Sequence, residues 1–147
     1  MQLSGTEQFP QPTDELWVRL TDLTLFARTL PRLDKIERVE PRLLECRVRP
    51  GLSFFAGTLR LKFEMLNEQP PSVARMRITG KGVGASVTVE TSIHLKPVNG
   101  GTELQWHSEV LELGGLLKPV SRGLIEAAAQ KVIADGWANF RRELAKS

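Results

Sequence analysis

Few side chains in this sequence could perform acid–base chemistry at neutral pH, and the two histidines are the first to consider. His94 and His107 are the only histidines, and each alternates with polar residues along a predicted strand. One interpretation is a pair of bases on two neighbouring strands, and the other is two solvated surface side chains. The polar neighbours favour the second interpretation.

Cysteine, metal and phosphate chemistry are also poorly supported. Cys46 is the single cysteine, so it cannot form a disulfide within the chain or build a zinc site alone. It alternates in step with Leu44 and Val48, which predicts a small core residue rather than a nucleophile. The glycines from Gly80 to Gly84 do not open a helix after a strand, so they predict a hairpin turn instead of a phosphate-binding loop. We therefore expect no catalytic residue, metal or cofactor, and a binding protein rather than an enzyme.

Glu7 is the polar residue whose position raises a functional question. It shares the phase of Leu3, Gly5 and Phe9 in the first predicted strand. If that face points inward, a buried carboxylate needs a partner or a raised pKa, and it could then bind the polar end of a ligand. If the strand lies at the edge of the sheet, Glu7 reaches solvent. Both alternatives stay open at this point.

The larger candidate site is apolar. Alternating strand residues and one helical stripe give a broad apolar face, and a curved sheet wrapped on a helix tends to leave an apolar pocket between them. The alternative is that these residues simply form a core. The predicted ligand-binding residues are Glu7, Phe26, Phe55, Leu59, Leu61, Phe63, Met65, Met76, Ile78, Val89, Trp106, Leu124 and Ala128.

The elements that must position these residues follow from the periodicity. A first strand over residues 3–9 is followed by two short helices, over residues 15–20 and 22–30. A period of two then continues to Leu113, with a hairpin signal at Asn99-Gly100-Gly101, and predicts about seven strands in all. From Leu117 the spacing becomes helical and predicts one long helix of roughly 28 residues. This order predicts an α+β fold in a single domain over residues 1–147, with an antiparallel sheet covered by the last helix.

Composition excludes several other classes. The chain is 41% hydrophobic and 25% charged, which is ordinary for a globular protein. Its formal net charge is +3, the signs are mixed along the chain, and it has three tryptophans and no tyrosine, so nothing indicates nucleic-acid binding. No apolar run is long enough to cross a bilayer, and no signal peptide is evident. We expect a cytoplasmic protein.

The order of elements and several motifs resemble the START-like, helix-grip (SRPBCC) superfamily, and within it the CoxG-like branch, which takes its name from a subunit of carbon monoxide dehydrogenase. The resemblance rests on Leu3-x-Gly5, Pro10-x-Pro12, Trp17, Leu20, Asp22, Leu30-Pro31, Phe55-Ala56-Gly57, Gly80-Lys81-Gly82-Val83-Gly84 and Gly101-Thr102-x-Leu104. The family usually has a glycine after the Leu-Pro or Ile-Pro pair, where this chain has Arg32.

This resemblance implies a helix-grip fold, in which a curved sheet grips the C-terminal helix. It also implies accessory proteins of molybdenum-containing dehydrogenases, linked to membrane recruitment and to quinone-like lipids. We expect a non-catalytic carrier for a small hydrophobic ligand, such as a lipid, a quinone or a polycyclic aromatic, held between sheet and helix. One alternative is a cyclase or hydratase of the same superfamily. Another is a docking subunit that binds an oxidoreductase or a membrane surface through residues 28–49.

Overall fold

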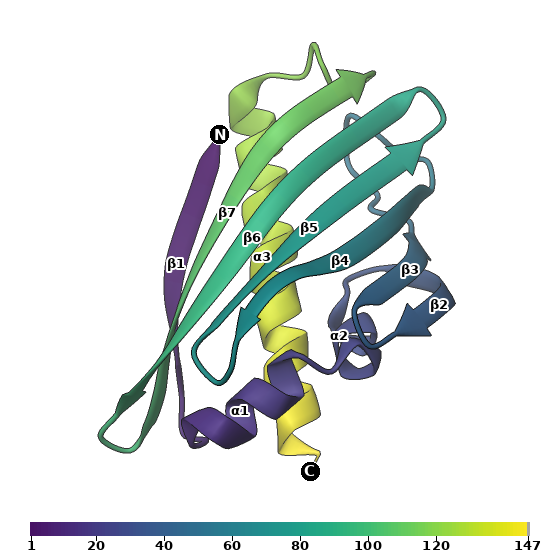
Figure 1. The fold of residues 1–147 in the computed structure, drawn as a ribbon. Coiled ribbons are helices and arrows are strands. Elements are labelled where there is room, and N and C mark those ends of the chain that lie inside the picture. Colours follow the sequence, from purple (N-terminus) through teal and green to yellow (C-terminus); the bar gives the residue numbers. More distant parts are fainter. Residues whose placement is uncertain (147) are drawn as a thin grey trace.

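The fold is one antiparallel sheet with three helices, seen here in a computed structural model that describes residues 1–146. The seven strands lie in the order β1-β7-β6-β5-β4-β3-β2. Figure 1 shows the curved sheet with α3 running along one face and α1 and α2 at one end. The elements are β1 (Gln2–Phe9), α1 (Thr13–Leu20), α2 (Leu23–Thr29), β2 (Leu33–Glu40), β3 (Leu43–Val48), β4 (Leu59–Gln69), β5 (Val73–Gly82), β6 (Ala85–Val98), β7 (Gly101–Gly115) and α3 (Arg122–Ala145). The predicted α+β helix-grip fold is confirmed.

The long C-terminal helix is shorter than its apolar spacing predicts. It begins at Arg122 instead of Leu117, because Ser121 adopts an extended conformation and its side chain accepts a hydrogen bond from the Leu124 backbone N–H. Pro119 also disfavours a helical conformation at the residue before it. Leu117 packs among buried residues at this end of the sheet, so its apolar character reflects tertiary packing and not the helix.

The two short helices pack at one end of the sheet, beside the C-terminal half of α3. Asp22 caps α2 by accepting hydrogen bonds from the backbone N–H groups of Thr24 and Leu25. α1 begins at Thr13, earlier than the predicted start at residue 15, and no side chain accepts a capping hydrogen bond there. Leu16 of α1 and Leu25 of α2 are almost fully buried, so apolar contacts hold both helices against the remainder of the fold.

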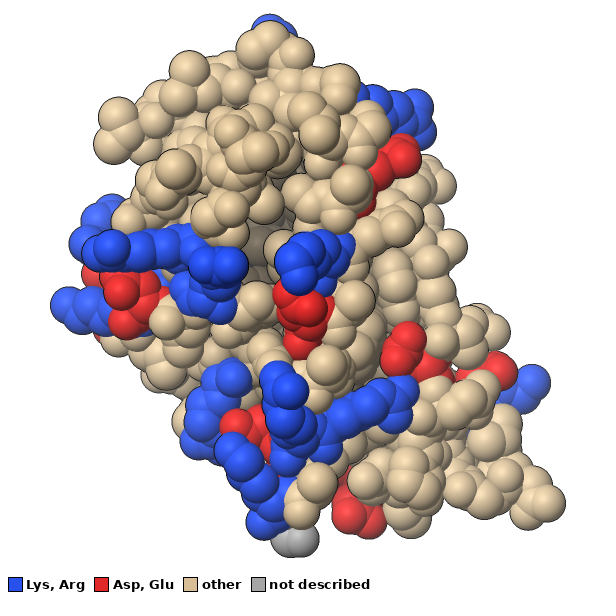
Figure 2. Space-filling view, turned by 180° about the vertical axis from the view of Figure 1, so that it is seen from behind, with Lys and Arg blue, Asp and Glu red and all other residues tan. Residues whose placement is uncertain are grey.

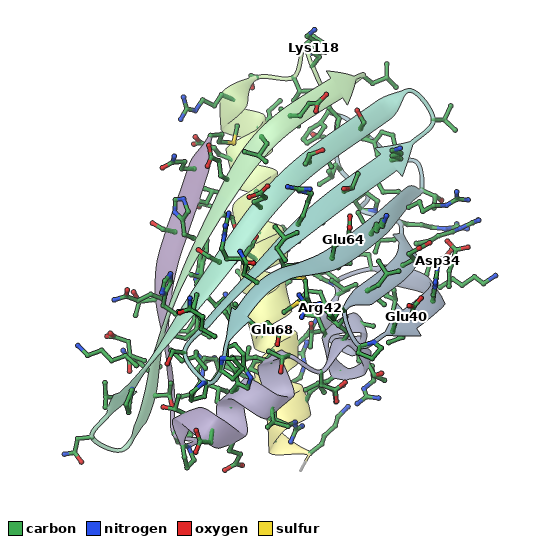
Figure 3. All side chains as sticks on the ribbon, viewed as in Figure 1. Asp34, Glu40, Arg42, Glu64, Glu68 and Lys118 are labelled. Carbon is green, nitrogen blue, oxygen red and sulfur yellow. The ribbon has the colours of Figure 1, made fainter. Side chains whose placement is uncertain are left out.

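A bulge in β4 contributes to the curvature of the sheet. The pairing of β4 with β5 shifts between Met65 and Asn67, and Arg42 donates hydrogen bonds to the carbonyls of Met65 and Leu66 at 3.1 and 3.2 Å. The Arg42 guanidinium also binds the Glu68 carboxylate at 2.8 Å, and Figure 3 shows these two side chains near one another at this end of β4. A bulge increases local twist and bends the strand. Arg42 therefore stabilises the bend of β4 beside the helices.

Candidate ligand-binding groove

The floor of the candidate site is the concave face of the sheet, where apolar residues on adjacent strands lie opposite one another. Met65 pairs with Met76, and Ile78 pairs with both Phe63 and Val89. Directly paired residues point to the same side of a sheet, so these side chains form one surface. Phe63 is buried, but the side chains of Met65, Met76, Ile78 and Val89 remain partly exposed although α3 runs along this face.

Only the C-terminal half of α3 packs closely on this surface. Trp137, Phe140 and Leu144 join a cluster of buried residues that includes Phe9 and Leu104. The ring of Phe140 contacts those of Phe9 and Trp137, with centroids 5.7 and 5.9 Å away. This end of the helix is therefore fixed to the sheet by a tightly packed aromatic cluster.

The N-terminal half of α3 is looser. In residues 122–133 only Ile125 is buried, whereas Leu124 is 50% exposed and Val132 is 44% exposed. Ala128 is half-buried, which places it on the side of the helix that faces the protein. Partly exposed apolar residues on both the helix and the sheet indicate that the two surfaces are not in full contact here.

These observations describe a groove between the middle of the sheet and the first half of α3. The cluster around Phe140 closes one end, and a second cluster, formed by Val48, Phe55, Leu59, Ala85 and Leu117, closes the other. Figure 2 shows the side of the molecule on which α3 lies, with a recess near its middle and basic side chains on both sides of it. An apolar recess of this kind suits a small apolar ligand.

Three polar groups lie on the otherwise apolar floor of the groove, and they belong to Thr91, Ser108 and Trp106. Of these residues, only Trp106 was among the predicted ligand-binding residues. The hydroxyls of Thr91 and Ser108 lie 2.9 Å apart and bind each other, which leaves one hydroxyl hydrogen available. The indole N–H of Trp106 is buried and has no acceptor among the described residues. Thr91 and Ser108 share the phase of Val89 and Trp106, so the signal was present in the alternation. Two hydroxyls and an indole N–H suit hydrogen bonding to a ligand oxygen.

The position of Trp106 explains the Leu3-x-Gly5 motif. Gly5 pairs with Trp106 across β1 and β7, and a Cβ atom at position 5 would lie only 2.7 Å from the indole ring. Any side chain at this position would therefore displace the ring. Gly5 allows the Trp106 indole to lie against the β1 backbone.

The other predicted ligand-binding residues differ in how deeply they are buried. Phe55, Leu59 and Phe63 are buried and contribute to the closed clusters. Phe26 stacks edge-on against Phe63 with ring centroids 5.1 Å apart, and Leu61 is partly exposed between the second cluster and the groove. Leu124 has the largest exposed fraction of the predicted ligand-binding residues.

Glu7 lies in an ion pair at the edge of the sheet. Its carboxylate accepts a hydrogen bond from Arg141 of α3 at 2.8 Å and its side chain is 27% exposed. The same guanidinium lies 4.2 Å from the centre of the Phe9 ring. Glu7 therefore links β1 to the C-terminal half of α3. The ion pair with Arg141 explains why this carboxylate shares the inward-facing side of β1, and no ligand is needed to explain its position.

The remaining reactive groups do not line the groove. Burial raises the pKa of the Cys46 thiol to about 11, and the Glu37 carboxylate adds to this shift, so the thiol is protonated at neutral pH. The interpretation of Cys46 as a small core residue is confirmed, since it is fully buried. His94 is exposed and His107 is partly exposed, and both point away from the concave face, as their pairing with Gln105 and Ser92 indicates.

Two surface cavities are lined by residues other than the predicted ligand-binding ones. One, of about 700 Å³, lies where the β6–β7 hairpin approaches Pro10, Pro12 and Thr13. The other, of about 360 Å³, is lined by Arg32, Leu33, Asp34 and Arg49. Arg32 has a φ of 59°, in the left-handed region, which costs an L-residue about 1–2 kcal/mol and explains why a glycine suits this position.

Comparison with known proteins identifies the family. Residues 5–145 match the family model that describes CoxG, a subunit of carbon monoxide dehydrogenase. The chain belongs to the CoxG family. The groove is thus a feature of a CoxG-family fold, and the resemblance predicted from the motifs is confirmed. The comparison with curated proteins gave no match.

Solved structures share the fold of this CoxG-family chain at low sequence identity. A conserved protein from Geobacillus kaustophilus is 21% identical with a TM-score of 0.89, over 100% of this chain and 97% of that one. A protein from Mesorhizobium loti is 15% identical with a TM-score of 0.66, over 100% and 98% of the two chains. A protein from Chromobacterium violaceum is 16% identical with a TM-score of 0.65, over 93% and 94%. Likeness at this level concerns the fold alone.

No helix among residues 1–146 is both long and apolar enough to cross a membrane.

Proposed function

We propose that this CoxG-family protein is a non-catalytic carrier of a small hydrophobic ligand, held in the groove between the sheet and the N-terminal half of α3. Family membership and fold support a ligand-binding or accessory role in general. The observation that carries the finer proposal is the contrast along α3, which packs closely at Phe140 but leaves Ala128 only half-buried and Val132 44% exposed.

The polar groups on the floor of the groove narrow the ligand class. The free N–H of Trp106 and the spare hydrogen of the Thr91–Ser108 pair are donors in an apolar surrounding. A buried donor without an acceptor costs about 1–3 kcal/mol, and a ligand oxygen in this position would recover that energy. We therefore favour ligands with an apolar body and a carbonyl or hydroxyl oxygen, which include quinones and several lipids.

Native mass spectrometry of the protein purified from its own host tests this proposal. We expect a stoichiometric mass of a few hundred daltons, released on denaturation and soluble in organic solvent. A panel of quinones, fatty acids and polycyclic aromatics should then raise the melting temperature of the empty protein. An empty protein whose melting temperature none of these compounds changes would refute the carrier function.

The family description supports a second candidate, which is an accessory subunit that binds an oxidoreductase. Most basic side chains of the predicted docking segment, residues 28–49, pair with a carboxylate in the structure; the paired ones are Arg28, Arg38, Arg42, Arg47 and Arg49. Exposed ion pairs of this kind contribute little to a long-range field. If such a partner binds through apolar surface, its affinity will change little with added salt, whereas binding through the basic segment would weaken steeply.

A further inference from the structure

We propose that Arg32 and Arg49 form a binding site for an anionic group, a carboxylate or a phosphate, at the mouth of the groove; this inference rests on the carrier function proposed above. The two arginines line the cavity of about 360 Å³ together with Leu33 and Asp34. Arg32 forms an ion pair with no carboxylate among the described residues, whereas Arg49 lies 3.6 Å from Asp34. The cavity therefore carries one positive charge in excess.

Arg32 is exposed, and its backbone lies beside that of Arg49. Its backbone carbonyl accepts a hydrogen bond from the Arg49 N–H at 3.1 Å, which brings the two arginines together at the start of β2 and the end of β3. Its side chain lies over Gly51, where a Cβ atom would come within 3.3 Å of the terminal nitrogen. The Arg32 guanidinium lines the cavity, and its planar set of N–H donors suits carboxylate and phosphate.

The backbone conformation of Arg32 is a second, independent observation. Its left-handed φ of 59° favours glycine, so arginine occupies a position where the backbone conformation disfavours any residue with a side chain. Strain of this kind gathers at functional sites, and an observed outlier supports a hypothesis of function. The residue at this strained position carries a guanidinium, which is a group that binds anions.

The surroundings of the cavity indicate which anion it takes. Leu33 lines the cavity and also packs against the clusters that contain Phe63 and Phe55. At Leu33 the charged cavity therefore adjoins the apolar interior. Asp34 lies toward the edge of the molecule in Figure 3. An amphiphile would place its chain along the groove and its charged end between Arg32 and Arg49. A free anion would use the arginines alone.

Binding of dodecanoate, dodecanol and inorganic phosphate at pH 8 distinguishes these cases. We expect dodecanoate to bind about tenfold more tightly than dodecanol, as a charge-assisted hydrogen bond at a partly exposed site allows. Arg32→Gly should abolish this preference and should raise the melting temperature by about 2–4 °C, because it removes the strained conformation. Lys96→Gln removes the same charge from a remote strand and should leave the preference intact.

The other possible outcomes of this binding experiment each test a different part of the proposal. Equal binding of acid and alcohol by the parent protein would overturn the anionic site and leave the carrier function standing. Phosphate that competes with dodecanoate in the parent but not in Arg32→Gly would assign the site to anions from free solution as well. Failure of both dodecanoate and dodecanol to bind would overturn the carrier function and this inference with it. A preference that persists in Arg32→Gly would refute the role of Arg32.

Discussion

Replacing Ala128 with phenylalanine is expected to weaken the binding of an apolar ligand at least tenfold without destabilising the protein. Ala128 is half-buried on the side of α3 that faces the sheet. A benzyl group there would occupy the groove between α3 and the sheet. If this region were a closed core, the added volume would instead cost about 1–3 kcal/mol of unfolding free energy. Ligand titration and urea denaturation of the same variant separate the two cases.

The neighbouring alanine provides a matched control. Ala127 lies one position away on α3, and its side chain is exposed. Ala127→Phe adds the same group to the same helix and should change neither the affinity nor the unfolding free energy by a measurable amount. Loss of affinity in both variants would show that phenylalanine disturbs α3 as a whole, and would contradict the placement of the ligand beside Ala128.

Replacing Phe140 with alanine should produce the largest loss of stability that α3 can show, about 3–5 kcal/mol. Phe140 is 5% exposed and contacts the rings of Phe9 and Trp137, so its removal leaves a cavity in the cluster that fixes the helix to the sheet. The fall in the midpoint of urea denaturation, at an unchanged slope, measures this loss.

The opposite half of the same helix should respond differently. Leu124 is 50% exposed, so Leu124→Ala removes few buried contacts and should cost only about 0.5 kcal/mol. Similar losses for Phe140→Ala and Leu124→Ala would show that α3 packs evenly along its length. The groove would then have no structural basis.

Most of the fold could be predicted from the sequence because two periodicities dominate it. The alternation from Leu59 onward gives β4 to β7, and the Asn99-Gly100-Gly101 signal marks the β6–β7 turn. The start of α3 could not be predicted from the apolar stripe alone, since Leu117 is apolar for a tertiary reason. Pro119 and Ser121 carried the local signal for the true start of the helix.

The candidate site was less predictable, for a physical reason. Periodicity identifies the face on which a side chain lies, but it does not distinguish a residue packed in a cluster from one that lines a groove. Phe63 and Ile78 pair across β4 and β5 and share a phase, yet Phe63 is buried and Ile78 is half-exposed. That difference depends on α2, which packs on Phe63 through residues such as Leu23 and Ala27. Likewise, the partner of Glu7 is Arg141, which is separated from it by 134 residues.

Chemical-shift mapping by NMR tests the central claim most directly. The protein would be labelled at its methionine methyl groups and tryptophan indole N–H groups, and titrated with menadione, a two-ring quinone. Met76 and Trp106 are partly exposed on the floor of the groove, although Trp106 also packs against the cluster that closes one end, whereas Trp17 is buried inside that cluster. We expect the Met76 methyl and Trp106 indole signals to shift saturably while the Trp17 signal stays in place. Menadione binding that leaves Met76 and Trp106 unchanged would contradict a ligand site between the sheet and α3.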